Sequence, residues 1–140
     1  MKILVGIDGS EPSGRAVEWV AERANALEAE VVAVHAIDLP VIVSPITAGI
    51  TLPEFRPIDR EEVREVTNTW CAPLTKAEVP FRVVLKDGEP ALTLIETAKA
   101  EDADLVVVGS RGRGGFTELL LGSTSHALSH HLRRPLLIVP

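Results

Sequence analysis

The sequence predicts a doubly wound α/β domain in which five parallel strands, in the order 3-2-1-4-5, carry helices on both faces. Short apolar runs alternate along the chain with segments of helical periodicity, and a long loop and a glycine loop interrupt this alternation. Most of the runs are apolar at consecutive positions, which is typical of strands that are covered on both faces. The length of 140 residues fits one domain with a single core.

Apolar runs of four to seven residues are predicted to form the strands. Helical segments separate them, so consecutive strands are expected to run parallel. The predicted strands are Ile3–Ile7, Val31–Ile37, Phe81–Leu85, Leu105–Gly109 and Leu136–Val139.

The first two helices are each predicted from a cap that precedes an apolar stripe. Ser10 caps the first, with Glu11 and Pro12 in its opening turn. Asp59 and Glu62 form a capping box for the second. The inward-facing positions are Ala16, Val17, Val20, Ala21, Ala24 and Leu27 in the first helix, and Val63, Val66, Trp70 and Leu74 in the second.

Proline and glycine mark the ends of the last two helices. Pro90 suits the first turn of the third helix. The fourth begins at Gly122 or Ser123 and runs to about His131, before Pro135. The inward-facing positions of the third helix are Ala91, Leu94, Ile95 and Ala98.

Composition excludes several classes of protein. Hydrophobic residues make up 46% of the chain and charged residues 24%, as in soluble globular proteins. A net charge of −6 argues against a nucleic-acid-binding surface, because such surfaces need clustered Lys and Arg. The single cysteine, Cys71, forms no internal disulfide, and no apolar stretch is long enough for a signal peptide or a membrane span. We therefore expect a cytoplasmic protein that binds neither nucleic acid nor membrane.

Two features of the sequence converge on the point where the strand order reverses. Asp8 follows the first strand, and the glycine-rich segment from Gly109 to Ser125 follows the fourth. In doubly wound folds the ligand crevice lies outside the carboxyl ends of the strands at this switch point. The end of the second strand, at 34–38, adds a third wall whose backbone could contact a base. An Asx turn that involves Asp8 is the structural alternative to a ligand contact.

The glycine segment ends at the predicted start of the fourth helix. Gly122, Ser123 and Thr124 would present backbone N–H groups, hydroxyls and the positive end of the helix dipole to an anion such as phosphate. Ordinary helix capping explains the same residues equally well. The spacing fits neither a Walker A loop nor a dinucleotide-binding fingerprint. The pattern is Gly109, two residues, Gly112, nine residues, Gly122-Ser123.

On these motifs the chain resembles the universal stress protein family. The glycine pattern matches the ATP-binding signature of the family, and ILVGIDGS, VHAID, ADLVVVGSRGRGG and RPLLIVP look like family segments in family order. The resemblance covers the chain except Leu39–Ile58 and implies one domain over 1–140 with the adenine nucleotide alpha hydrolase-like fold. Four prolines exclude regular structure from the variable loop 39–58, which could cover the nucleotide or pack on a partner chain.

The resemblance also implies the ligand and the site. It indicates ATP, with Mg²⁺ or Mn²⁺, and a homodimer. A dimer also agrees with the unpaired edge of the last strand. Arg111 could screen phosphate charge or simply be solvated. The implied contacts are Ile7 and Asp8 with the nucleoside, the backbone near Ala36 with adenine, Gly109 and Gly112 with ribose and phosphate, and Gly122, Ser123 and Thr124 with the phosphates.

The sequence contains no recognisable catalytic constellation beside the phosphate loop. We therefore expect a nucleotide-dependent regulatory or stress-response protein with little or no hydrolysis. An ATP-using enzyme and a dimeric interaction module that binds no nucleotide stay open as alternatives. His126 and His130 have a spacing that can bind zinc, but the sequence places no carboxylate or cysteine to complete such a site, so surface histidines are the favoured interpretation. His35 is expected to be a packed, hydrogen-bonded core residue.

Overall fold

The computed structural model describes residues 1–38, 58–112 and 120–140. A sheet of five parallel strands has the order β3-β2-β1-β4-β5, as predicted. All of the predicted loop 39–58 except residue 58, and residues 113–119 of the glycine-rich segment, lie outside the described residues. The strands are β1 Lys2–Gly6, β2 Glu30–Ile37, β3 Phe81–Asp87, β4 Leu105–Gly109 and β5 Leu136–Val139.

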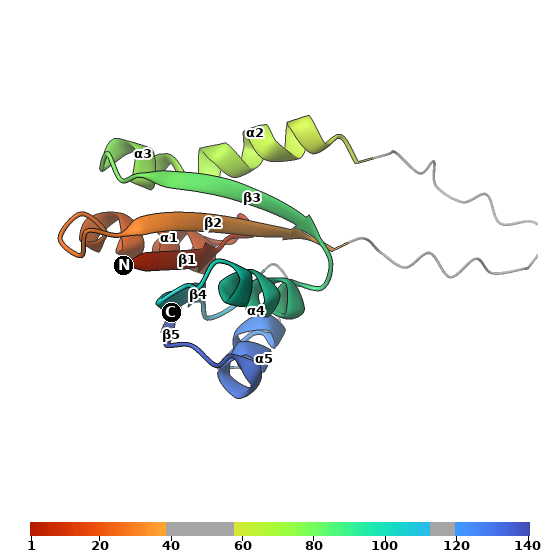
Figure 1. Ribbon diagram of the computed structural model, residues 1–140. Helices are drawn as coiled ribbons and strands as arrows, with labels where there is room; N and C mark the ends of the chain where they lie inside the picture. Colours follow the sequence, from red (N-terminus) through yellow and green to blue (C-terminus); the bar gives the residue numbers. More distant parts are fainter. Residues whose placement is uncertain (39–57, 113–119) are drawn as a thin grey trace, which may run out of the picture.

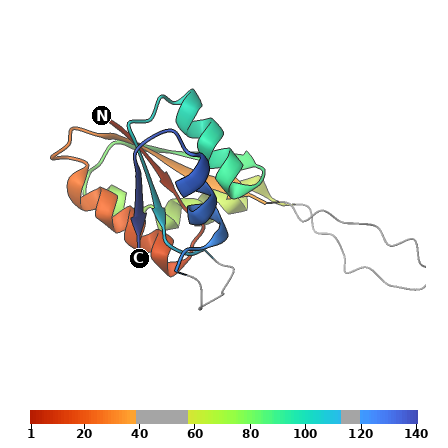
Figure 2. The same ribbon diagram turned by 90° about the horizontal axis from the view of Figure 1, so that it is seen from below.

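Helices cover both faces of this sheet (Figures 1 and 2). On one face, a buried cluster that includes Ile3, Val5 and Val31 packs against α1 and α3. On the other, a cluster that includes Leu4, Val32 and Val106 packs against α4 and α5. The alternation of β1 side chains between the clusters explains its unbroken apolar run. The helices are α1 Glu11–Arg23, α2 Arg60–Trp70, α3 Ala72–Lys76, α4 Pro90–Ala100 and α5 Ser123–His131.

The predicted cap of α1 is confirmed, but its apolar stripe is shorter than predicted. The Ser10 side chain accepts a hydrogen bond from the Ser13 amide. Leu27 is 40% exposed, so its inward-facing assignment was wrong. The reason is that α1 ends at Arg23 and the chain then turns at Glu28, whose φ is 47°.

The second predicted helix is in fact two helices. It breaks at Cys71, because Pro73 lacks an N–H and a proline ring disturbs the preceding turn. Val66 is 43% exposed, so its inward-facing assignment was also wrong. Only Thr67 of α2 is buried, since this helix lies against the edge strand β3 (Figure 1). Asp59 caps α2 as predicted and accepts hydrogen bonds from the amides of residues 61 and 62.

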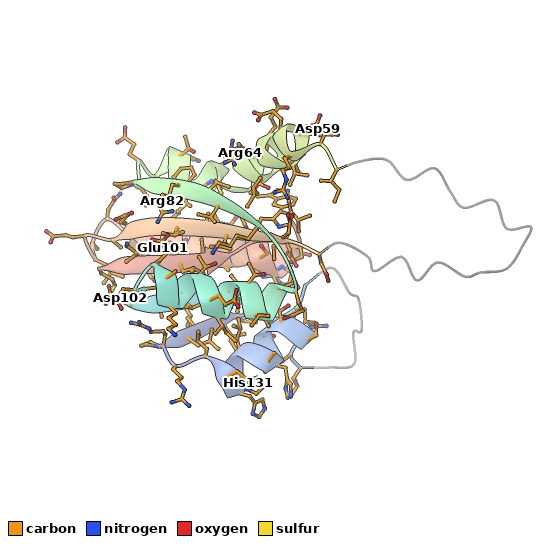
Figure 3. All side chains as sticks on the ribbon, turned by 45° about the vertical axis from the view of Figure 1, so that its right-hand side comes forward. Asp59, Arg64, Arg82, Glu101, Asp102 and His131 are labelled. Atoms are coloured by element: carbon orange, nitrogen blue, oxygen red, sulfur yellow. The ribbon has the colours of Figure 1, made fainter. Side chains whose placement is uncertain are left out.

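Ion pairs tie the elements together at the amino end of the sheet. Glu101, just after α4, pairs with Arg82 of β3 (Figure 3). It also pairs with Lys2 of β1 at 3.4 Å. The Arg82 guanidinium lowers the pKa of the Glu101 carboxyl. These contacts lie at the end of the strands opposite to the predicted site. No helix in the described residues is long and apolar enough to cross a membrane.

Candidate functional site

The carboxyl ends of β1 and β4 lie side by side, because these strands are paired in the sheet. A cleft of about 1850 Å³ opens at this edge. Small-molecule pockets usually measure ~300–1,000 Å³, so a small ligand would fill only part of this cleft. The residues predicted for the site all line this cleft: Ile7, Asp8, Ala36, Gly109, Arg111, Gly112, Gly122, Ser123 and Thr124.

Asp8 organises the turn that leads from β1 into α1. Its Oδ1 accepts hydrogen bonds from the Ser10 amide at 2.9 Å and from the Ser10 hydroxyl at 2.5 Å. The Asx turn considered as an alternative for Asp8 is therefore present. The other carboxylate oxygen lies over Gly112, where an added Cβ would stand 2.7 Å from Oδ2. The carboxylate thus faces the glycine segment across the cleft.

Two serines that the sequence did not single out as site residues link these segments. The Ser10 hydroxyl lies 3.4 Å from the carbonyl oxygen of Arg111, which joins the start of α1 to the loop after β4. Ser13 accepts a hydrogen bond from the Asp8 amide at 3.1 Å. Both residues belong to the cap of α1, so the geometry of that cap and the position of Asp8 depend on one another.

Gly109 is explained by packing within the chain. A Cβ at this position would stand 2.6 Å from the backbone carbon of Pro12 and 2.7 Å from the Ser13 nitrogen. Real side chains do not approach backbone so closely, so glycine lets the first turn of α1 lie against the end of β4. Gly109 also lines the cleft.

The two ends of the glycine segment are held together by Ser110. Its carbonyl oxygen accepts hydrogen bonds from the Gly122 amide at 2.7 Å and from the Ser125 hydroxyl at 2.8 Å. Ser110 and Ser125 are both buried. A Cβ on Gly122 would stand 3.1 Å from the Cα of Arg111. The start of α5 is therefore fixed against the end of β4.

This arrangement changes the expected role of Gly122. Its amide is already bonded to Ser110, so it is not an open donor for an anion. The first intrahelical bond of α5 runs from the His126 amide to the Gly122 carbonyl at 2.9 Å. The amides of Ser123, Thr124 and Ser125 stand before that bond, in the turn where helix N–H groups lack intrahelical partners.

The start of α5 differs from those of the other long helices. Side chains cap α1, α2 and α4, through Ser10, Asp59 and Glu89 respectively. Within the described residues, α5 has no side-chain cap, and its first turn lines the cleft. The positive end of the α5 dipole therefore faces the cleft, and no side chain caps its backbone N–H groups. Both features favour an anion there.

His35 holds the neighbouring wall in place. Its Nδ1 lies 2.8 Å from the carbonyl oxygen of Ile7, and its ring meets Trp70 edge-on with centroids 5.2 Å apart. Because a carbonyl oxygen only accepts, Nδ1 carries the proton in this bond. The predicted hydrogen bond is confirmed, but the ring is half-buried rather than in the core, and it lines the cleft beside Ala36.

A five-stranded parallel sheet with helices on both faces and a cleft at the switch point places the protein among the doubly wound α/β folds. The sequence also matches the universal stress protein family over residues 1–140. The chain belongs to that family.

Two curated relatives illustrate the match. Universal stress protein YxiE of Bacillus subtilis is 31% identical over 144 residues, which span 99% of this chain and 97% of YxiE. Universal stress protein Rv2623 of Mycobacterium tuberculosis is 34% identical over 137 residues, which span 97% of this chain but only 44% of Rv2623. The chain thus corresponds to nearly all of one relative and to less than half of the other.

Solved structures share the fold. A universal stress protein in complex with cAMP has a TM-score of 0.73 and 23% identity, over 100% of this chain and 96% of that one. The universal stress protein of Archaeoglobus fulgidus in complex with dAMP has a TM-score of 0.70 and 20% identity, over 100% and 98% of the two chains. At these identities the likeness establishes the fold of the chain.

Proposed function

We propose that this protein binds ATP in the cleft between β1, β4 and α5 and acts as a nucleotide-dependent regulatory protein. The observation that carries the proposal is the start of α5, which has no side-chain cap and lies against the end of the strand that precedes it. Family membership adds support, as do the cAMP and dAMP complexes of the structural neighbours.

Different residues of the cleft would bind different parts of the nucleotide. The amides of Ser123, Thr124 and Ser125 and the hydroxyls of the first two would hold phosphate oxygens, since helix N-termini bind anions. Asp8 and Ile7 would contact the nucleoside, and the backbone at Ala36 would contact adenine. Gly109 and Gly112 would let ribose and phosphate approach the chain, and Arg111 would offset phosphate charge.

The divalent ion would arrive with the nucleotide. In the described part of the chain, no group of three or more His, Cys, Asp or Glu side chains is placed to hold a metal. Mg²⁺ and Mn²⁺ are commonly bound through substrate phosphates and water, with few protein ligands. The chain therefore fits an ion that ATP carries, and the ion would offset the charge of the phosphates.

The carboxylates near the start of α1 favour binding over turnover. Asp8 is held by Ser10 through Oδ1, and Glu11 pairs with Arg15 at 2.9 Å. Hydrolysis would need a base, such as a carboxylate aimed at the terminal phosphate, to position the attacking water. We therefore propose a regulatory role in the stress response with slow or absent hydrolysis. An ATP-using enzyme and an interaction module that binds no nucleotide are the alternatives that the experiment below distinguishes.

We further propose a cytoplasmic homodimer that pairs through β5. This strand lies at the edge of the sheet, where β4 is its neighbour, and its four residues are only half-buried. An edge strand presents unpaired backbone groups that a second copy could pair with. Sedimentation of the chain at several concentrations tests this assembly.

The experiment titrates ATP with Mg²⁺ into wild-type protein and into the double variant Ser123→Ala/Thr124→Ala, with Ser129→Ala as the matched control. Ser129 is also on α5, but its hydroxyl bonds to the His126 carbonyl at 2.6 Å, away from the helix start. We expect the double variant to lose about tenfold or more in affinity for each of the two hydroxyls, since each lost charge-assisted hydrogen bond costs ~1.5–3 kcal/mol. The Ser129 variant should match wild type. Equal ATP affinity in all three proteins would refute the phosphate site, and rapid ADP release would favour the enzyme.

A further inference from the structure

Two exposed histidines lie together on the outer side of α5. The ring centroids of His126 and His130 are 4.7 Å apart, and the ring planes are inclined at 60°. The next histidine, His131, is farther from His130, at 6.3 Å between centroids. Figure 3 shows His131 on α5, on the side away from the sheet. The close pair has the i, i+4 spacing that places two side chains on one face of a helix.

The backbone that carries the pair is held firmly. Leu128, between the two histidines, is fully buried in the cluster shared with α4. Ser125, one residue before His126, bonds to the carbonyl of Ser110 at 2.8 Å. The core side of α5 is thus anchored at two points, and the imidazoles project from a rigid helix. Binding of a common ligand by the two imidazoles therefore costs little conformational entropy of the backbone.

Imidazole pairs of this kind suit divalent transition metals. Neutral histidine binds Zn²⁺, Cu²⁺ and Ni²⁺ well and Mg²⁺ poorly. With metal–nitrogen bonds of ~2.0–2.1 Å, two rings on a tetrahedral ion have centroids about 5 Å apart. The observed separation of 4.7 Å is close to this value.

We propose that His126 and His130 form a binding site for a divalent transition-metal ion at the rim of the cleft. His130 lies in the last turn of α5, where the helix dipole favours a cation. His126 lines the cleft. Because the described residues place no third His, Cys, Asp or Glu beside the pair, the other coordination positions would be filled by water or by anionic oxygens in the cleft. The site uses other side chains than the proposed nucleotide contacts, and its metal is of a different class from the Mg²⁺ or Mn²⁺ of ATP.

The test is a calorimetric titration of Zn²⁺ into the 140-residue chain without a histidine tag and without nucleotide. The variants are His126→Gln and His130→Gln, and His131→Gln is the matched control one residue away. We expect saturable binding of about one ion per chain in wild type, weakened at least about tenfold in each of the first two variants. The control should stay within about twofold of wild type, and Mg²⁺ should not compete.

Two results would overturn the site. One is the absence of saturable Zn²⁺ binding in wild type up to millimolar concentrations. The other is an equal loss of affinity in the His131 control, which would mean nonspecific binding to surface histidines. All three side chains are exposed, so each variant should fold as the wild type does, and unfolding curves check this. Since no nucleotide is present, the outcome is independent of whether ATP binds the cleft.

Discussion

Three glycines around the cleft each lie in close contact with another part of the chain. Gly109 makes room for the backbone of Pro12, Gly112 for the carboxylate of Asp8, and Gly122 for the Cα of Arg111. None of these three has a positive φ among the backbone angles of the described residues. Close approach, and not backbone conformation, therefore explains them. The glycines of the signature therefore let the segments around the cleft pack closely, in addition to any role in ligand binding.

Gly14 lacks such a contact, and its replacement by alanine is expected to stabilise the protein. It lies inside α1, and a Cβ there would meet nothing within 4 Å. Alanine in a helix interior is favoured over glycine by about 0.5–1 kcal/mol. Urea unfolding of Gly14→Ala should show a gain of this size with unchanged ATP affinity.

The matched control is Gly109→Ala, in which the same methyl group would stand 2.6 Å from backbone. This variant should lose ~1–3 kcal/mol, as overpacked sites do. Equal stability changes in the two variants would contradict the packing described for Gly109.

Two variants of Asp8 can distinguish its structural role in the turn from its proposed role in ligand binding. Asp8→Asn keeps a side-chain oxygen for the Ser10 amide, so its free energy of unfolding should lie within about 0.5 kcal/mol of wild type. Asp8→Ala loses the turn and should be destabilised by about 1 kcal/mol, with at least tenfold weaker ATP binding. Denaturant unfolding and calorimetry measure the two effects. Wild-type ATP affinity in Asp8→Ala would exclude a nucleoside contact for this residue.

At the scale of elements, the sequence predicted the structure best where local pattern and tertiary environment agree. The apolar runs of β1, β2 and β4 were sufficient to predict these strands, because all three lie inside the sheet. The helix around Cys71 was predicted less well. Its apolar spacing suggested one buried stripe, whereas the edge position of β3 leaves α2 half-covered, and the break precedes Pro73. Edge position is a property of the sheet and has no local signal in the sequence.

The junction of α2 and α3 should make stability depend on pH in the alkaline range. Burial raises the pKa of the Cys71 thiol from 9.0 to about 11. The unfolded chain therefore releases this proton at lower pH than the folded chain. The corresponding stability is fully present below pH 9 and is lost as the pH rises towards about 11.

Unfolding of wild type and Cys71→Ala, measured from pH 8 to pH 11, isolates this contribution. The variant should be less stable at pH 8, because it leaves a small cavity, and its stability should fall less steeply above pH 9. Parallel pH profiles in the two proteins would show that the thiol has the same pKa in the folded and unfolded chains, and would contradict the effect of burial.

At the scale of the whole molecule, two ends of one sheet have different roles. The amino end is closed by the ion pairs of Glu101 with Arg82 and Lys2, and the carboxyl end holds the cleft. The sequence identified the lining of the cleft, because strand order brings the ends of β1 and β4 together. It did not identify Ser13, Ser110 or Ser125, whose partners are residues brought close by folding, such as the Ser110 carbonyl with Ser125.

The most direct test of ATP binding is to denature freshly purified protein, identify any released nucleotide by mass, and titrate the stripped protein with ATP and Mg²⁺. We predict near-stoichiometric ATP or micromolar binding, without rapid ADP formation. Bound ATP should also raise the stability of the fold, by ~2.7 kcal/mol at a hundred times the dissociation constant. No nucleotide, no heat of binding and unchanged stability would contradict the account and leave the glycines of the cleft as packing residues alone.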